Sequence, residues 1–290
     1  MANSPAHKLG EYIGWFLENM MIKKIEPIAS NYGLYTDHEH SRKARNGNKK
    51  VRWNDDIGNH HDLDIVLEKH GTEEQFGIPI VFIEMAWRRY TKHSKNKAQE
   101  ISDSVRAVIR NNATYAPFYA VVLAGTFTAN SIKQLKSEGF SVLYFNYNIV
   151  KEAFSSITNI NISTDEKTTE NKIQEIYNLL NKLSDEQIEK VENKLIALNK
   201  NEYDKFISEL TTSINRKTAK IFISTNFRTS NNFVKLTDAI NFLEQINEQD
   251  EYNKASFYQF RVEILFDNNE SVTGNFYNAS KAISFLKLNI

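Results

Sequence analysis

Two acidic residues fall on neighbouring strand-like runs and have the types and spacing that could do chemistry. Asp64 lies in the run "DLDIVLE", and Glu84 lies near the end of the run "IPIVFIEMAW". Residues two apart on a strand share a face, so Glu84, Ala86 and Arg88 are expected on one face of the second run. If the two strands pair with Asp64 near Glu84, their carboxylates converge.

Converging carboxylates predict a metal site. Two carboxylates in a partly buried place repel each other, and a divalent cation between them removes the energetic cost of this repulsion. The chain has no cysteine, so any metal must be held by oxygen atoms or imidazoles. The backbone carbonyl of Met85 would complete a set of oxygen ligands that suits Mg²⁺, with Mn²⁺ as a substitute. Such an ion generates hydroxide and stabilises charge that builds on a phosphate.

The alternative is that Asp64 and Glu84 are strand-end residues that face solvent. The run that holds Glu84 is apolar on both faces, which is typical of a central strand. An acidic residue within a central strand needs a partner. We therefore favour the metal site.

The surrounding pattern predicts an α/β domain that positions these acids. A helical segment begins near residue 7 and precedes the two strand-like runs. Ser94 is a suitable N-cap for a helix that extends to about Asn112. A buried strand, a helix, a strand and a further helix follow. The order helix, strand, strand, helix, strand, helix, strand predicts a mixed central sheet with helices on its faces.

We expect three parts in the chain. Residues 1–160 form the domain that carries the acids, and residues 161–215 form a helical spacer with an acid- and lysine-rich surface. Residues 216–290 form a smaller α+β domain that serves in recognition or oligomerisation. Within it, the segment at 221–243 aligns without gaps with the segment at 264–286. Each segment predicts a strand, a turn, a strand and a helix, hence a tandem ββα repeat.

The arrangement over roughly residues 7–150 resembles the PD-(D/E)XK nuclease superfamily, whose restriction-endonuclease-like core has the order α-β-β-β-α-β. The Asp of the family motif falls on Asp64 and the Glu on Glu84. Glu18, on the first helix, matches a position where many members carry another acidic ligand. The resemblance implies Mg²⁺-dependent hydrolysis of phosphodiester bonds in double-stranded DNA, as in a type II restriction enzyme or a related defence nuclease.

The chain departs from the family motif at the lysine, because Ala86 stands where the lysine belongs. Arg88 shares the strand face but cannot give up a proton, so it would only stabilise charge. Lys97, one turn into the following helix, is the better candidate for the catalytic cation. Lys92 and Gln99 are further options. For each of these side chains the alternative is an ordinary solvated group.

Two basic runs flank the acids in sequence. Residues 42–52 hold six cations and no acid, and residues 88–97 hold five more. The equal totals of 36 cations and 36 anions argue mildly against a nucleic-acid binder, but the local distribution matters more. We expect DNA contacts from the first run and from one lysine of the second; the alternative is two solvated surface segments. The expected contacts are Arg42, Lys43, Arg45, Lys49, Lys50, Arg52 and Lys92.

Several alternatives stay open at this point. The missing lysine favours a catalytically inactive core that binds nucleic acid or serves in assembly. A structure-specific repair nuclease is another possibility, and His60, His61 and His93 suggest a weaker one, a transition-metal site. Cutting both strands usually needs two active sites, so a homodimer is expected, with a cognate methyltransferase as a partner of a restriction enzyme. No run resembles a signal peptide or a membrane span, so a cytoplasmic protein without membrane contact is expected.

Overall fold

A five-stranded mixed sheet forms the centre of the protein in the computed structural model, which describes residues 4–90, 94–165, 167–225, 230–247 and 260–289. The strand order is β1-β4-β5-β6-β7. β4 is antiparallel to both of its neighbours, β1 and β5, whereas β5, β6 and β7 are parallel to one another. This architecture confirms the predicted fold class. The strands are β1 (Leu34–Asp37), β4 (Ile65–Lys69), β5 (Ile78–Arg88), β6 (Phe118–Gly125) and β7 (Ser141–Asn146).

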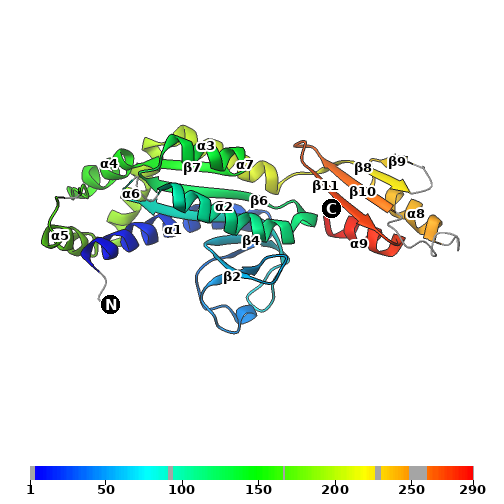
Figure 1. The fold of residues 1–290 in the computed structure, drawn as a ribbon, viewed down its shortest axis with the longest axis horizontal. Helices are drawn as coiled ribbons and strands as arrows, with labels where there is room; N and C mark the ends of the chain where they lie inside the picture. The colour runs from blue at the N-terminus through cyan, green and yellow to red at the C-terminus, as the bar shows by residue number, and fades with distance from the viewer. Residues whose placement is uncertain (1–3, 91–93, 166, 226–229, 248–259, 290) are drawn as a thin grey trace.

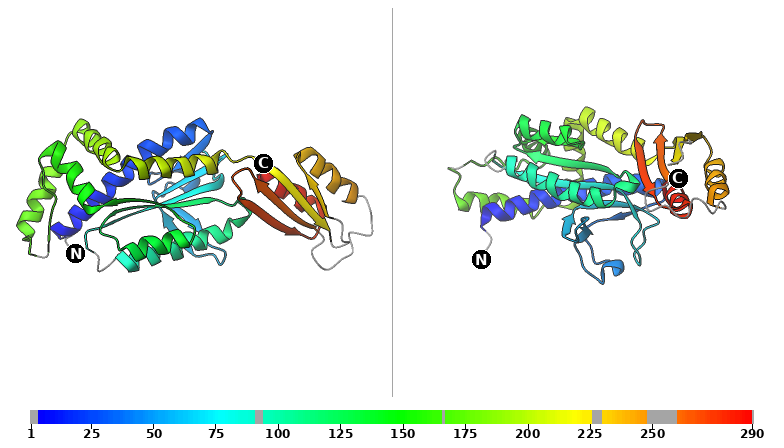
Figure 2. Two further views of the ribbon diagram at one scale, coloured as in Figure 1. Left: turned by 90° about the horizontal axis from the view of Figure 1, so that it is seen from above. Right: turned by 45° about the vertical axis from the view of Figure 1, so that its right-hand side comes forward.

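Helices cover both faces of this sheet (Figures 1 and 2). The long helix α1 (Pro5–Asn31) packs on one face, together with α4 (Tyr147–Thr158), and the two enclose the larger apolar core. The helices α2 (Ser94–Asn111) and α3 (Ala129–Ser137) pack on the other face around a second core. The central strand β5 contributes alternate side chains to the two cores, which explains why its sequence is apolar on both faces.

The helices expected to form a spacer are part of the larger core, so that prediction is wrong. They are α5 (Glu170–Leu180), α6 (Asp185–Leu198) and α7 (Lys200–Ile214). Each presents an apolar face to the core that α1 encloses, and the acid- and lysine-rich faces point outward. The charged surface dominates the sequence pattern, whereas the buried stripes of α5 and α6 pack mainly on α1 and α4, and that of α7 packs on β6 and β7. The buried residues are Ile173, Ile176, Leu180, Val191, Leu195, Phe206 and Leu210.

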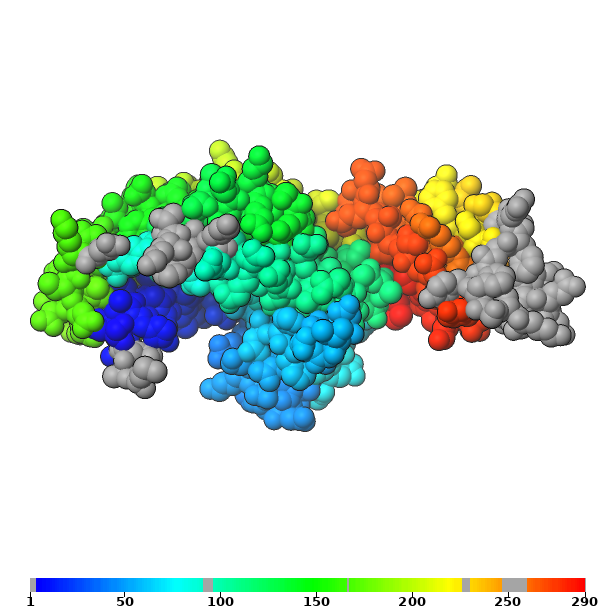
Figure 3. Space-filling model, viewed as in Figure 1, coloured from blue at the N-terminus to red at the C-terminus, as the bar shows by residue number. Residues whose placement is uncertain are grey.

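The run expected as one strand around Asp64 is two strands. β3 (His60–Leu63) pairs with β2 (Val51–Asn54) in a separate two-stranded sheet, and β4 begins after a bend at Asp64. The segment 38–63, here called the hairpin lobe, protrudes from the main body in Figure 3. The first basic run therefore lies on this lobe and leads into the strand that follows Asp64.

A buried ion network anchors the hairpin lobe to the sheet and overturns part of the predicted DNA contact. Arg42 is fully buried, and its Nη1 lies 2.8 Å from Asp37 Oδ2 and 2.6 Å from Glu68 Oε1. The guanidinium also lies over the ring of Tyr35, 4.3 Å from its centroid. Arg42 therefore cannot reach a phosphate, and its assignment to DNA is wrong.

Arg45 belongs to the same network and is corrected for the same reason. It is 7% exposed, pairs with Asp37, and donates from Nη2 to the carbonyls of His40 at 2.7 Å and Lys49 at 3.1 Å. A run of cations in a sequence does not reveal which members meet buried acids. Here Asp37 lies on the strand before the lobe in the sequence and Glu68 lies on the strand after it, and the two acids neutralise the two arginines.

The C-terminal part is a four-stranded antiparallel sheet with two helices on one face, and it contains the predicted repeat. The strand order is β11-β10-β8-β9, and Ile221 pairs with its repeat partner Ile264. A residue that pairs with its own counterpart marks a pseudo-two-fold axis between the two units. The first unit is β8 (Thr218–Thr225), β9 (Ser230–Phe233) and α8 (Leu236–Asn247), and the second is β10 (Phe260–Phe266), β11 (Ser271–Phe276) and α9 (Ala279–Asn289).

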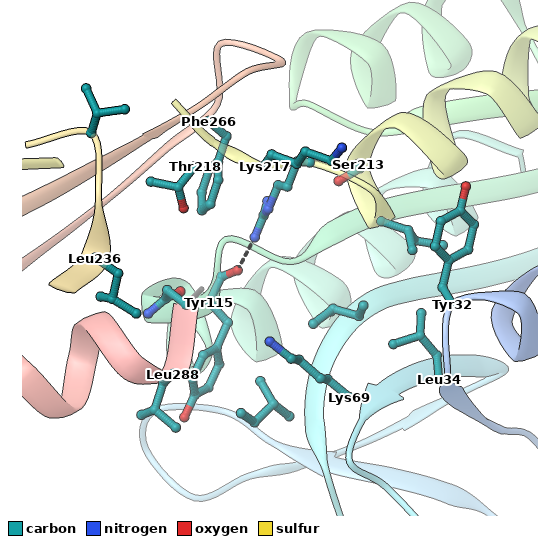
Figure 4. Close-up of a pocket in the computed structure, with 16 residues that line it drawn as sticks. Tyr32, Leu34, Lys69, Tyr115, Ser213, Lys217, Thr218, Leu236, Phe266 and Leu288 are labelled. Atoms are coloured by element: carbon teal, nitrogen blue, oxygen red, sulfur yellow. Dashed lines mark hydrogen bonds between the residues drawn. The ribbon is translucent and has the colours of Figure 1, made fainter. Parts of the chain in front are cut away.

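Arg216 joins this C-terminal sheet to the main body. Its guanidinium donates to the carbonyls of Ala116 at 2.7 Å and Tyr115 at 2.6 Å, pairs with Glu270 at 2.7 Å, and lies over the ring of Phe266. Figure 4 shows the cavity at this junction, where side chains from both parts meet. The contacts connect the end of the short helix before β6 (Ala113–Tyr115) to the turn between β10 and β11.

No helix among the described residues is both long and apolar enough to span a bilayer.

Replacing Arg42 with methionine should destabilise the protein by about 3–5 kcal/mol, because removal of one partner leaves buried carboxylates unpaired. Lys43→Met is the matched control, since the Lys43 side chain is 74% exposed and pairs only with exposed Glu74. Urea denaturation followed by circular dichroism measures both free energies of unfolding. Equal stability of the two variants would show that the Arg42 network does not hold the lobe.

Candidate metal and catalytic site

The register between β4 and β5 brings Asp64 and Glu84 opposite each other. Ile65 pairs with Ile83, so the next position on each strand, at the open end of β4, is Asp64 against Glu84. The Oδ2 atom of Asp64 accepts a hydrogen bond from the Met85 amide at 2.6 Å. The two acids that the sequence singled out are therefore neighbours across an antiparallel pair.

Glu84 is buried, and one of its oxygen atoms has no partner. It is 8% exposed and lies between Phe82 and Ala86 on the face of β5 that packs against α2. Within the described chain its Oε1 atom accepts no hydrogen bond. A buried carboxylate oxygen without a donor is costly, and it is the kind of atom that a cation satisfies.

Burial and mutual repulsion suppress the ionisation of three acids in this region. Burial, reinforced by the Asp64 charge, raises the pKa of Glu84 well above its usual value. Burial also raises the pKa of Asp64 to about 6, against the hydrogen bond from Met85 and the charge of Lys97. On α1, burial and then the charge of Asp64 raise the pKa of Glu18 to about 7. Without a cation, each of the three carboxyl groups therefore holds its proton to a higher pH than an exposed carboxyl group does.

Lys97 is the predicted cation that reaches these acids. Burial is the main influence on the pKa values of Asp64 and Glu84, and the charge of Lys97 opposes it in both. The Lys97 side chain is 20% exposed, and its Nζ lies 2.7 Å from Glu100 Oε1. Lys97 thus occupies the side of α2 next to the site and is not a fully solvated lysine.

The other candidates for the missing lysine are placed differently. Arg88 lies four residues beyond Glu84 on β5, where its Nη1 donates to the Trp87 carbonyl at 2.9 Å. Gln99 is exposed on α2. Lys92 and His93 lie outside the described residues.

The residues present fit a divalent cation held by few protein ligands. The described residues contain no group of three or more Asp, Glu or His that could hold a metal ion. Asp64 and Glu84 would supply two ligands to such an ion, and backbone and water would supply the rest, which suits Mg²⁺. The Met85 N–H points to Asp64, and the N–H and C=O of one strand residue point to the same edge. The Met85 carbonyl is thus on the correct edge of β5 to contribute.

Glu39 is an acid of this region that the sequence pattern did not single out. Its charge raises the pKa values of Glu18 and Asp64, after the effect of burial. Glu39 follows β1, a strand of only four residues that was not predicted, so nothing in the sequence placed it near the other acids. The acidic end of β1 is therefore a further edge of the site.

The remaining cations of the hairpin lobe are exposed, but two share an acid. Lys50 Nζ lies 2.7 Å from Asp62 Oδ2, and Arg52 Nε lies 2.9 Å from Asp62 Oδ1. Lys49 is exposed, as is Lys43. The positive surface of the lobe is thus smaller than the sequence run suggests, yet four of its six cations stay accessible.

The two histidines of β3 have different partners. His60 Nδ1 lies 2.6 Å from Asn54 Oδ1, and His61 Nε2 lies 3.2 Å from Asp55 Oδ2. Each histidine thus fixes the hairpin turn locally.

Comparisons with known proteins add little. No family model and no curated protein matches the chain. A crystal structure described as a protein of unknown function, AF1548, is similar over 66% of this chain and 98% of its own length, with 12% identity and a TM-score of 0.30. A likeness of this size carries no argument about fold or function.

Glu84→Gln should stabilise the metal-free protein at neutral pH. A carboxyl group whose pKa is raised by folding contributes stability below its unfolded pKa of about 4.5, and that stability is lost as the pH rises through the folded pKa. Glutamine has no proton to lose, so the variant does not lose stability in this way. Its free energy of unfolding should therefore exceed that of wild type above about pH 4.5, and the difference should grow by about 1.4 kcal/mol for each pH unit up to the folded pKa of Glu84. Denaturation in EDTA across pH 4–8 measures it.

Glu68→Gln is the matched control, because Glu68 is also buried but accepts from the Arg42 guanidinium at 2.6 and 3.0 Å. It should destabilise the protein. A loss of stability in both variants would contradict the assignment of Glu84 as an acid without a protein partner.

Proposed function

We propose that the protein is a Mg²⁺-dependent endonuclease that hydrolyses phosphodiester bonds in double-stranded DNA, as a type II restriction enzyme or a related defence nuclease. The observation that carries this proposal is the pair Asp64 and Glu84, with the unpartnered Oε1 atom of Glu84 between them and α2. Mg²⁺ is the proposed cofactor, and Mn²⁺ is expected to replace it.

The order of elements around the pair supports the proposal. Without the hairpin lobe, α1, β1, β4, β5, α2 and β6 follow one another, and this is the α-β-β-β-α-β order of the PD-(D/E)XK nucleases that the sequence resembles. Asp64 lies just before the second strand of that order, β4, and Glu84 lies on the third, β5. β1 is the first of the three strands, and the sequence pattern did not reveal it.

Each residue of the site has a distinct task in this proposal. Asp64 and Glu84 hold the ion, which when bound supplies a hydroxide nucleophile and stabilises the charge that builds on the phosphate. The Met85 amide fixes the Asp64 carboxylate through its 2.6 Å hydrogen bond. Lys97 replaces the motif lysine and stabilises negative charge beside the attacked phosphate. Glu18 accepts a proton readily, because its pKa of about 7 lies near physiological pH.

A second candidate function is a catalytically inactive core that binds nucleic acid, and the observation that favours it is Ala86. This residue is 5% exposed and packs in the second core, where the family motif has a lysine. The two functions differ in one result. Only the enzyme cuts plasmid DNA with Mg²⁺ and stops in EDTA, and discrete products would separate a sequence-specific enzyme from a structure-specific repair nuclease.

The proposed enzyme acts as a homodimer, since two strands need two active sites, and a cognate methyltransferase would protect the DNA of the host. The C-terminal ββα repeat is the proposed element for recognition or association.

Asp64→Asn should lower the rate of Mg²⁺-dependent plasmid cleavage by at least about a thousandfold, because the ion contributes several kcal/mol to the transition state. The substitution keeps the size of the side chain and its acceptor for the Met85 amide. Asp62→Asn is the matched control two residues away. Its carboxylate pairs with Lys50 and Arg52 on the lobe, so cleavage should change little. Near-normal cleavage by Asp64→Asn would show that the site is elsewhere.

The hairpin lobe should contribute to DNA affinity through Lys49, Lys50 and Arg52. Replacing all three with alanine should weaken binding and reduce the slope of log K against log salt by about 0.9 for each lost phosphate contact, hence by roughly two to three units. Fluorescence anisotropy at several salt concentrations measures the slope. The control replaces three exposed helix lysines, Lys172, Lys190 and Lys200. If both triple variants have the wild-type slope, DNA approaches from another side.

A further inference from the structure

A cavity of about 450 Å³ lies beyond the carboxyl end of β5, next to the candidate site. Met85, Ala86 and Lys97 line it on the side of the paired acids, and α1 lines it with Gly10 and Gly14. Its volume is within the roughly 300–1,000 Å³ of small-ligand sites. The carboxyl ends of parallel strands are where α/β sheets bind ligands.

Three polar atoms on residues that line this cavity are buried without a hydrogen-bond partner among the described residues. They are Arg88 Nε, Arg89 Nε and Thr164 Oγ1, out of seven such atoms found in the described chain. Thr164 is nine-tenths buried, with 9% of its surface exposed. A buried donor without a partner destabilises a fold, so three at one cavity indicate a ligand that satisfies them.

The backbone that carries the two arginines is held firmly. The Thr126 amide donates to the Arg88 carbonyl at 2.7 Å, and the Thr126 hydroxyl donates to the Arg89 carbonyl at 3.0 Å. Gly125 has a φ of +94°, and a Cβ there would lie 2.1 Å from the Arg88 oxygen. The end of β6 therefore requires glycine at this point and fixes the backbone that carries Arg88 and Arg89. Arg89 Nη2 also donates to the Asp165 carbonyl at 3.0 Å.

The unpartnered atoms determine the chemistry of the ligand. A guanidinium only donates hydrogen bonds, and the Thr164 hydroxyl can donate as well, so together they suit a phosphate oxygen. The acid on the cavity wall, Glu11, lies 3.0 Å from His7 Nε2, and both side chains are more than half exposed. The charge of Glu11 thus lies at the solvent side, away from the buried donors.

The rest of the wall is aromatic and apolar. Trp87 and Tyr147 stack with ring centroids 5.9 Å apart at 29°. A Cβ built on Gly10 or Gly14 meets no atom within 4 Å, so this side of α1 borders open space. Such a wall suits a sugar and a planar base beside the phosphate.

We propose that this cavity binds one nucleotide unit of the substrate strand, with its phosphate on Arg88, Arg89 and Thr164 and its sugar and base against Trp87 and the glycines of α1. The inference rests on the proposed function, because it takes the ligand from DNA held at Asp64 and Glu84. A base enters such a cavity only after it leaves the duplex stack. The site would thus select an unpaired or displaced nucleotide beside the cut.

Calorimetric titration with thymidine 5′-monophosphate in EDTA tests the inference without the metal. The nucleotide should bind more tightly than inorganic phosphate or thymidine alone. Thr164→Val keeps the side-chain size and removes only the unpartnered hydroxyl. The unliganded variant should be as stable as wild type or more stable, while its affinity for the nucleotide falls about tenfold.

Gly14→Leu should fill the cavity and abolish nucleotide binding while the protein stays folded, because leucine favours a helix more than glycine does. Ser30→Leu, at an exposed position near the end of the same helix, is the control and should bind as wild type does. Absence of nucleotide binding, or binding that both Thr164→Val and Gly14→Leu leave unchanged, would overturn the inference. Phosphate binding as tight as nucleotide binding would overturn the assignment of the sugar and base.

Asp64→Asn separates this inference from the proposed function, since it should lose cleavage but bind the nucleotide normally. A wild-type protein that binds the nucleotide as described and never cuts DNA would contradict the proposed function alone. One that cuts DNA but does not bind the nucleotide would contradict the inference alone.

Discussion

The repulsion between Asp64 and Glu84 is the constraint on which the rest of the site depends. The two carboxylates face each other at the open end of β4, and burial holds Glu84 away from water. A chain that needed only stability would place an apolar pair there, because an unpaired acid in a central strand is costly. The two acids cost the fold stability, and one oxygen of Glu84 has no partner among the described residues. These two observations are the physical basis for proposing a cation at the site.

The neighbouring elements hold Asp64 and Glu84 close together despite their repulsion. The bend at Asp64 separates β3 from β4, and the buried network of Arg42 with Asp37 and Glu68 ties the hairpin lobe to the sheet. The lobe, which carries the accessible cations, is therefore attached to the sheet by buried ion pairs. On the other side, α2 brings Lys97 to the acids. The proposed substrate contacts and the proposed metal ligands thus depend on the same short stretch of β4 and β5.

Much of this could be predicted from the sequence, and the failures have physical causes. Period-two spacing and the apolar run around Glu84 indicate a central strand and single out the two acids, while the pairing of Asp64 with Glu84 is only a condition at that stage and comes from the observed register. The repeat was found because its identities recur at a fixed spacing, and Ile221 indeed pairs with Ile264. Arg42 was misassigned because burial against Asp37 and Glu68 is a tertiary property. The spacer was misassigned because the charged faces of its helices concealed the apolar stripe. The cavity donors at Arg88, Arg89 and Thr164 have no sequence signal, since segments far apart in the chain meet there.

The most direct test of the account is the number of protons released when Mn²⁺ binds the protein without DNA. Calorimetric titrations at pH 6.5 in buffers of different ionisation enthalpy measure that number. A cation would bind the proposed site only through ionised carboxylates, and the pKa values of Asp64 and Glu84 are raised, so Mn²⁺ binding should release protons. The number of protons released should decline as the pH rises. The Glu84→Gln variant should show neither proton release nor tight Mn²⁺ binding. Mn²⁺ that fails to bind the wild type, or that binds it and Glu84→Gln alike, would contradict the paired carboxylates as a metal site.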